Sequence, residues 1–166
     1  PSVHSVSRYA GFVLQSQKTT IADIYAARLA IEPYAARQLA ENPTPQRIER
    51  LRDEVGQLTQ LAEDEQFVEF MIHLAVFHRV LVELTDNRTL LLITTILQDV
   101  VARYQVEFLK KRNLDRVTQR KRALWGLKSF YKLIDKIEAG DASSAEEHWR
   151  LHLIAANKTW VELMNP

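Results

Sequence analysis

Glycine is scarce in this chain, and that scarcity constrains the fold more than any other feature of the sequence. Only four glycines occur in 166 residues, while apolar residues recur at spacings of three and four along most of the chain. This periodicity is typical of amphipathic helices. We therefore predict an all-α fold, an antiparallel bundle of six or seven helices, and we find no support for strands.

Cap residues and prolines divide the chain into helical segments. Thr20, Thr44 and Asp141 are suited to N-caps, Gly140 to a helix C-terminus, and Pro33 predicts a kink inside the first long helix. Residues 1–16 are expected to be a linker or an extra short helix, centred on residues 6–14, and residues 17–166 to form the helical domain. The predicted long helices cover residues 21–42, 45–63, 65–84, 90–109, 115–138 and 141–163.

Composition limits what the chain can do. The 22 Lys and Arg residues nearly balance the 21 Asp and Glu residues, so direct DNA binding by this segment is not expected. No cysteine is present, which excludes disulfides and thiolate chemistry and suits the cytoplasm.

The longest apolar run, residues 90–97, is far shorter than a membrane-spanning helix. No signal peptide is recognisable, and Pro1 in place of a methionine indicates a fragment or a processed chain.

A basic cluster covers residues 110–116 and continues with Arg120, Lys121 and Arg122. It lacks the interleaved aromatic residues that stack on bases, and it lies at a loop and a helix start. We interpret it as a solvated turn.

His78 lies in the apolar run FMIHLAVFHRV and shares a helical stripe with Met71 and Leu74. It is therefore expected to point inward. His152 lies on a similar stripe with Trp149 and Ala156. Each can be a neutral core imidazole whose nitrogens are satisfied by neighbours, or both can share a polar pocket.

His148 and His152 have the four-residue spacing that lets two imidazoles on one helix bind a metal. No Glu accompanies them as in a zinc protease, so one surface and one buried histidine is the favoured interpretation. Trp125, Trp149 and Trp160 lie on helical stripes and are assigned to the core.

Arg28 allows two interpretations. It can pair with Glu32 four residues later on the helix surface, or its guanidinium can point into a cavity and bind a carboxylate or phosphate. Periodicity does not decide between them.

Four motifs together resemble a known family. They are TTIADIYAARLAIEPYAARQLAENPT, the Phe77-His78 pair followed by Leu-Thr-Asp-Asn at 84–87, IEAGDASSAEEHW, and His152-Leu153. In this order they resemble the C-terminal effector-binding (FCD) domain of GntR-type transcription regulators of the FadR subfamily, from about residue 17 to the end. The resemblance implies a homodimerising helical domain that follows a winged-helix DNA-binding domain, absent here, and that binds a small molecule.

Many members of that family bind a divalent metal such as zinc. By resemblance, His78 and His152 match two of the four ligands. Leu74 stands where the family has an Asp, and Phe130 where a Glu-His pair is usual, so no metal is favoured, and any metal present would use His78 and His152.

The sequence thus predicts a non-catalytic, cytoplasmic effector domain that binds an anionic or amphipathic metabolite and reaches DNA only through the preceding domain, with no membrane partner. Arg28 is the residue expected to bind the ligand's anion. The alternatives are a metal-dependent protein or enzyme using His78, His148 and His152, and a helical interaction module without a ligand. The expected ligand-binding residues are Arg28, Leu74, His78, Phe130, Trp149 and His152.

Overall fold

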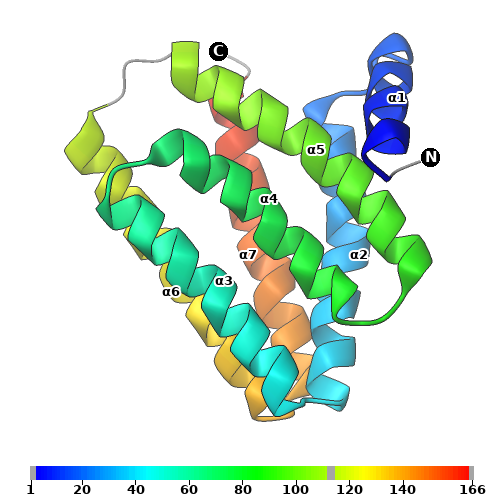
Figure 1. The fold of residues 1–166 in the computed structure, drawn as a ribbon, viewed down its shortest axis with the longest axis vertical. Coiled ribbons are helices and arrows are strands. Elements are labelled where there is room, and N and C mark those ends of the chain that lie inside the picture. Colours follow the sequence, from blue (N-terminus) through cyan, green and yellow to red (C-terminus); the bar gives the residue numbers. More distant parts are fainter. Residues whose placement is uncertain (1–2, 112–114, 165–166) are drawn as a thin grey trace.

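The computed structural model describes residues 3–111 and 115–164, which form seven helices and no strand (Figure 1). The all-α prediction is therefore confirmed. The helices are α1 (Val3–Ser16), α2 (Ile21–Glu41), α3 (Pro45–Glu63), α4 (Phe67–Glu83), α5 (Arg88–Lys111), α6 (Arg116–Glu138) and α7 (Ala142–Met164).

The predicted caps begin and end these helices. Thr20 and Asp23 form a reciprocal capping box, in which the Thr20 side chain accepts from the Asp23 amide and the Asp23 carboxylate accepts from the Thr20 amide. The Thr44 hydroxyl likewise accepts from Arg47 N, and Pro45 occupies the first turn of α3. Gly140 ends the connection after α6 with a φ of 71°, in the left-handed region that favours glycine. These predicted helix boundaries are confirmed.

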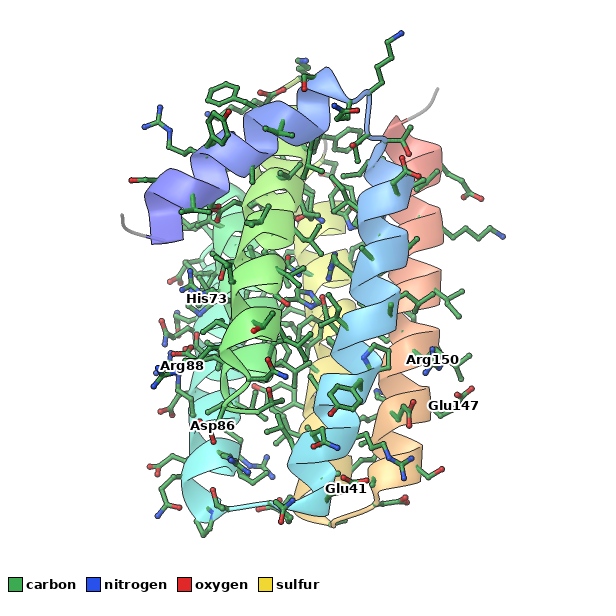
Figure 2. The ribbon with its side chains drawn as sticks, turned by 90° about the vertical axis from the view of Figure 1, so that its right-hand side faces the viewer. Glu41, His73, Asp86, Arg88, Glu147 and Arg150 are labelled. Atoms are coloured by element: carbon green, nitrogen blue, oxygen red, sulfur yellow. The ribbon has the colours of Figure 1, made fainter. Side chains whose placement is uncertain are left out.

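The helices pack in antiparallel pairs (Figure 1). α2 lies against α7, α3 against α6, and α4 against α5. α1 packs on α5 and crosses one end of the bundle (Figure 2). α2 continues through Pro33 to Glu41, so the proline removes one backbone donor without ending the helix. The long helices thereby enclose the centre of the bundle from several sides.

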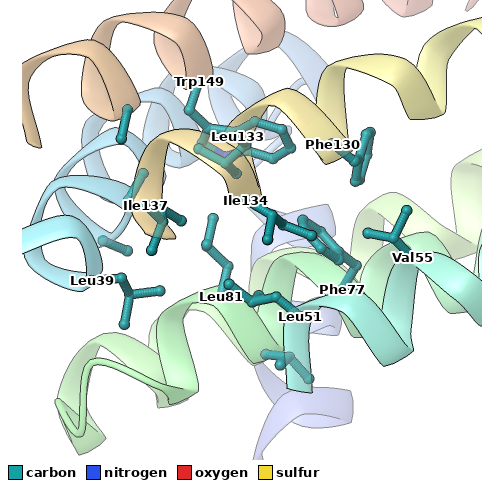
Figure 3. Close-up of a cluster of buried hydrophobic side chains, with 14 of the residues drawn as sticks. Leu39, Leu51, Val55, Phe77, Leu81, Phe130, Leu133, Ile134, Ile137 and Trp149 are labelled. Carbon is teal, nitrogen blue, oxygen red and sulfur yellow. The ribbon is translucent and has the colours of Figure 1, made fainter. Parts of the chain in front are cut away.

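Two apolar clusters hold the bundle together. The main cluster joins side chains from α2, α3, α4, α6 and α7. Figure 3 draws 14 of them and labels Leu39, Leu51, Val55, Phe77, Leu81, Phe130, Leu133, Ile134, Ile137 and Trp149. The second cluster lies toward α1 and comprises Ile24, Tyr25, Leu97, Val100 and Val101, with Leu14 and Trp160 packed against it. The space between these clusters is where the cavity described below is found.

The tryptophans divide between core and surface. Trp149 is fully buried and Trp160 is partly buried, as expected for core residues. Trp125 is 75% exposed, so its assignment to the core is wrong. Its stripe on α6 faces the opening of a cavity rather than packed side chains.

Charged side chains cover the outer faces of the helices. Glu41 and Glu147 point away from the bundle on the side of α2 and α7, and Asp86 and Arg88 lie near the start of α5 (Figure 2). Residues 112–114 of the basic cluster lie outside the described residues. Across the described part of the chain, no helix combines the length and apolar character needed to cross a membrane.

Replacing Leu51 by Ala should lower the free energy of unfolding by about 2–5 kcal/mol, because Leu51 is fully buried in the main cluster. Leu151→Ala is the matched control, since Leu151 is 57% exposed on α7, and it should change the stability by less than about 0.5 kcal/mol. Urea unfolding followed by circular dichroism measures both. Equal losses in the two variants would contradict this core assignment.

Candidate functional site

A buried carboxylate lies at the centre of the bundle. Glu32 of α2 has no exposed surface. Its Oε1 accepts hydrogen bonds from Arg28 Nε at 2.8 Å and from Gln98 Nε2 at 3.0 Å. Its Oε2 accepts from Trp149 Nε1 at 3.0 Å and lies 2.7 Å from His78 Nδ1. A carboxylate has about four acceptor positions, so these four donors saturate it.

These neighbours keep Glu32 ionised. Burial alone would raise the pKa of this carboxyl, but the charge of Arg28 and the contact with His78 outweigh burial and lower the pKa to about 2. Glu32 therefore carries a full negative charge at neutral pH, and Arg28 carries the charge that balances it. We call Arg28, Glu32, His78, Gln98 and Trp149 the polar floor.

The hydrogen bonds of the polar floor assign a tautomer to His78. Its Nδ1 lies 2.7 Å from Glu32 Oε2 and 3.0 Å from Arg28 Nη2. A lone pair on Nδ1 would face the carboxylate at the shorter distance and would be repelled, so Nδ1 carries the proton and donates to Glu32. The Arg28 Nη2 contact is then a close approach without a hydrogen bond. His78 Nε2 is left as an acceptor without a partner among the described residues.

The pKa of His78 is lowered. Burial is the largest cause, and the positive charge of Arg28 adds to it, while Glu32 acts in the opposite direction. His78 is therefore neutral at neutral pH.

A cavity of about 1160 Å³ opens above the polar floor. It lies between α4, α5, α6 and α7, and its walls are mainly apolar, with Phe70, Met71, Leu127 and Val101 among them. The volume slightly exceeds the usual range for sites that enclose small organic molecules, roughly 300–1,000 Å³. The cavity is therefore large enough for an elongated ligand.

His152 of α7 adds a second imidazole to this cavity. Its ring stacks on Trp149, with 4.5 Å between centroids and 12° between planes, and it meets the edge of Phe130 at 5.1 Å. Burial, and then the proximity of His78, lower the pKa of His152 to about 3. Neither ring nitrogen has a hydrogen-bond partner in the described part of the chain.

The structure brings five of the six expected ligand-binding residues to this cavity: Arg28, Leu74, His78, Phe130 and His152. Trp149 is the exception. It is completely enclosed between Glu32, Phe77 and His152 and does not line the cavity. Its helical stripe points to the centre of the bundle, behind the cavity wall, so it supports the site and does not contact the space inside.

Both interpretations of Arg28 hold in part. It pairs with Glu32 four residues later, but the pair is buried, with 5% and 1% side-chain exposure, and is not a surface pair. Arg28 also lines the cavity. Sequence reasoning treated Glu32 only as a surface partner, although it lies on the same inward stripe as Tyr25, Arg28 and Leu39. That shared stripe was the signal that could have identified it.

The mouth of the cavity carries positive charge that the sequence interpretation missed. Lys121, Arg122, Lys128 and Lys132 of α6 are exposed and line the opening, and we call these four residues the basic rim. The interpretation of Lys121 and Arg122 as part of a solvated turn is wrong, because both lie within α6. Because they recur at helical spacing with Trp125, they share the face of α6 that borders the cavity.

The residues present do not fit the metal site of related domains. No group of three or more His, Cys, Asp or Glu side chains converges in a metal-binding arrangement within residues 3–111 and 115–164. His148 Nε2 is engaged by Ser129, with 2.8 Å to the backbone oxygen and 3.1 Å to the hydroxyl. His148 is partly buried, rather than a surface residue. Leu74 and Phe130, at the two positions where the resemblance implies metal ligands, present apolar side chains to the cavity.

The buried ion pair between Arg28 and Glu32 should contribute to the stability of the fold. Arg28→Met should lower the free energy of unfolding at pH 7 by about 3–5 kcal/mol, because it leaves a buried carboxylate without its balancing charge. Adding Glu32→Gln should recover part of that loss, because the uncompensated charge disappears. Arg37→Met is the control. Arg37 also pairs with a carboxylate four residues away, Glu41, and with Glu146, but these partners are 38% and 28% exposed, so the loss should be much smaller. A double variant less stable than Arg28→Met would contradict this charge balance.

The low pKa of His152 should make the free energy of unfolding depend on pH. Its pKa is about 3 in the folded chain against an ordinary 6.5, so the unfolded chain takes up the proton first. The free energy of unfolding should therefore fall as the pH drops from about 6.5 toward about 3. His152→Gln should flatten this dependence, measured by urea unfolding at a series of pH values. Parallel curves for the two proteins would contradict a neutral, partly buried His152.

A comparison with known families agrees with this architecture. No curated protein matches the chain. The model of the FCD domain matches residues 23–155, which include every residue of the polar floor. That match covers most of the chain: nearly all of α2, all of α3 to α6, and α7 as far as Ala155. The chain therefore belongs to the FCD domain family, the ligand-binding domain of GntR-type transcription regulators.

Proposed function

We propose that this chain senses an anionic or amphipathic metabolite that binds in the cavity between α4, α5, α6 and α7. One observation carries the proposal: a large apolar cavity ends on a saturated polar floor, beside imidazole nitrogens that have no partner among the described residues. Apolar walls with a few convergent polar groups are the usual profile of a small-molecule site.

The ligand would contact His78 and His152 at the inner end and Leu74 and Phe130 along the walls. Imidazole nitrogens that line the cavity and have no partner among the described residues favour a ligand with polar groups there, because they can exchange contact with water for a hydrogen bond to the ligand. Arg28, already paired with Glu32, borders the same space. Trp149 would fix the stacked orientation of His152 without touching the ligand.

A path from the cavity to the first helix supports a regulatory role. Val101 and Trp160 both line the cavity. Val101 also belongs to the second apolar cluster, and Trp160 packs against that cluster. Leu14 of α1 packs against the same cluster. A ligand that contacts Trp160 differently in two arrangements of the bundle would therefore change the packing of α1, and such a difference in affinity is what regulation requires.

In the intact regulator we propose that this domain forms a homodimer in the cytoplasm and acts on DNA through a winged-helix domain joined near α1. A change in the packing of α1 would then alter the relative position of two DNA-binding domains. The FCD domain belongs to regulatory proteins rather than enzymes, and we propose no catalytic activity for this chain.

Two alternatives remain to be tested against this proposal. An interaction module without a ligand would be expected to have a filled core, so the cavity supports the effector domain instead. A metal-dependent protein would use His78, His148 and His152, but His148 Nε2 is engaged by Ser129. Metal analysis of protein purified without an affinity tag separates the classes, because stoichiometric metal lost on replacing His78 or His152 would exclude the metal-free sensor.

A metabolite panel tests the proposal directly. Thermal unfolding should show stabilisation by at least one organic acid or amphipathic acid, because a ligand that binds only the folded state raises its melting temperature. Ala156→Phe should abolish the stabilisation, since Ala156 lines the cavity and a phenyl ring would occupy its space.

Ala26→Phe is the matched control, because Ala26 is exposed on α2 and does not line the cavity. It should respond to ligands as the unchanged protein does. If no compound stabilises the protein, or if Ala156→Phe responds as strongly as Ala26→Phe, the proposed function is wrong.

A further inference from the structure

The charges of the polar floor limit what a ligand can present to it. Glu32 is ionised and is saturated by four donors, and the single charge of Arg28 balances it. The floor is thus neutral as a whole. A ligand carboxylate at this end would lie near the carboxylate of Glu32 with no unbalanced cation to offset the loss of its hydration.

The free hydrogen-bonding positions at the floor favour a donor. Because His78 Nδ1 carries the proton bound to Glu32, its Nε2 can only accept. His152 in its neutral form offers one acceptor and one donor, both without partners in the described residues. A hydroxyl or a primary amide can both donate and accept, so it satisfies these nitrogens, whereas a carboxylate cannot donate to His78.

The mouth of the cavity is positively charged, whereas the floor is neutral. In the described part of the chain, no acidic side chain forms a salt bridge with Lys121, Arg122, Lys128 or Lys132, although Lys121 is close enough to Asp115 to help lower the pKa of that carboxyl. The cavity lining contains one acidic residue, Glu162, which lies 3.9 Å from Lys158. The basic rim therefore carries a net positive charge that favours an anionic group at the mouth.

The two ends are separated along α6. Phe130 touches His152 at the inner end. Lys121 and Arg122 lie nine and eight residues nearer the start of the helix, roughly 12–14 Å away along the axis, whereas Lys128 and Lys132 flank Phe130 along the axis and are exposed. The wall between the two ends is apolar, with Leu127 facing the space. The cavity therefore has a neutral polar end, an apolar middle and a cationic mouth, in that order.

We propose that the effector is an elongated amphipathic acid that binds in one orientation, with its anionic group at the basic rim and a neutral, hydrogen-bond-donating group, a hydroxyl or an amide, at His78 and His152. This inference rests on the proposed function and specifies its ligand. It also assigns the anion to the basic rim rather than to Arg28.

Three acids of equal chain length test the orientation: decanoate, ω-hydroxydecanoate and decanedioate. Their affinities are measured by isothermal titration calorimetry at low ionic strength and at pH 7. ω-Hydroxydecanoate should bind about threefold to tenfold more tightly than decanoate, as expected for one net hydrogen bond. Decanedioate should bind more weakly than decanoate, because its second carboxylate would be buried at the neutral floor.

Variants at each end separate the two contacts. His152→Phe keeps an aromatic ring between Phe130 and Trp149 and should bring the ratio of affinities for the hydroxy acid and decanoate close to one. Lys121→Gln, Arg122→Gln and Lys128→Gln combined should weaken both acids by about tenfold or more, while the uncharged diol of the same length should bind unchanged. The matched control combines Arg8→Gln, Arg88→Gln and Lys110→Gln, which remove the same charge from exposed positions outside the cavity.

Several results would overturn this inference. Equal affinities for decanoate and the hydroxy acid would show that the floor does not require a hydrogen-bond donor. Tightest binding of decanedioate would indicate that an anionic group binds at Arg28. If the rim variant and its control bind the acids with the same affinity, the basic rim does not bind the anionic group. If none of the acids binds, the inference is overturned, whereas the metabolite panel still decides the proposed function. Binding that survives Ala156→Phe would instead count against the proposed function.

Discussion

The buried charge of Glu32 is the constraint on which the rest of this structure depends. An ionised carboxylate away from water is stable only when its acceptor positions are filled and its charge is balanced. Its four donors come from α2, α4, α5 and α7, so satisfying one side chain brings four helices together. The same requirement gives His78 its tautomer and Trp149 its position, and through Trp149 it supports the ring of His152.

Much of the fold could be predicted from local signals. The capping residues Thr20 and Thr44, the left-handed Gly140 and the spacing of apolar residues give the helices and most of their ends, because these features act over a few residues. The inward direction of His78 follows from the same periodicity and is confirmed. Family motifs identified the domain, and the FCD match agrees with them.

The chemistry of the site could be predicted only in part. Helical spacing shows that Arg28 and Glu32 are neighbours, but whether the pair is buried depends on α4, α5 and α7, which are distant in sequence. Gln98 of α5 gave no local signal, since its role is defined by a bond to Glu32 across 66 positions. Trp125 was expected in the core but is exposed, because an apolar helical stripe can border an open cavity as readily as a packed core.

The position of Trp149 along α7 has a mechanical consequence. The hydrogen bond to Glu32 and full enclosure hold this helix at Trp149, and the buried Ala145 and Leu153 anchor the same half of the helix on either side of it. Trp160 lies eleven residues further along, roughly 16 Å away, and is only partly buried. With Trp149 bound to Glu32, a tilt of α7 about this residue would move the far half of the helix most. A tilt of only a few degrees about Trp149 would displace Trp160, and the cluster that contacts α1, by on the order of 1 Å, while the hydrogen bonds of Glu32 remain intact.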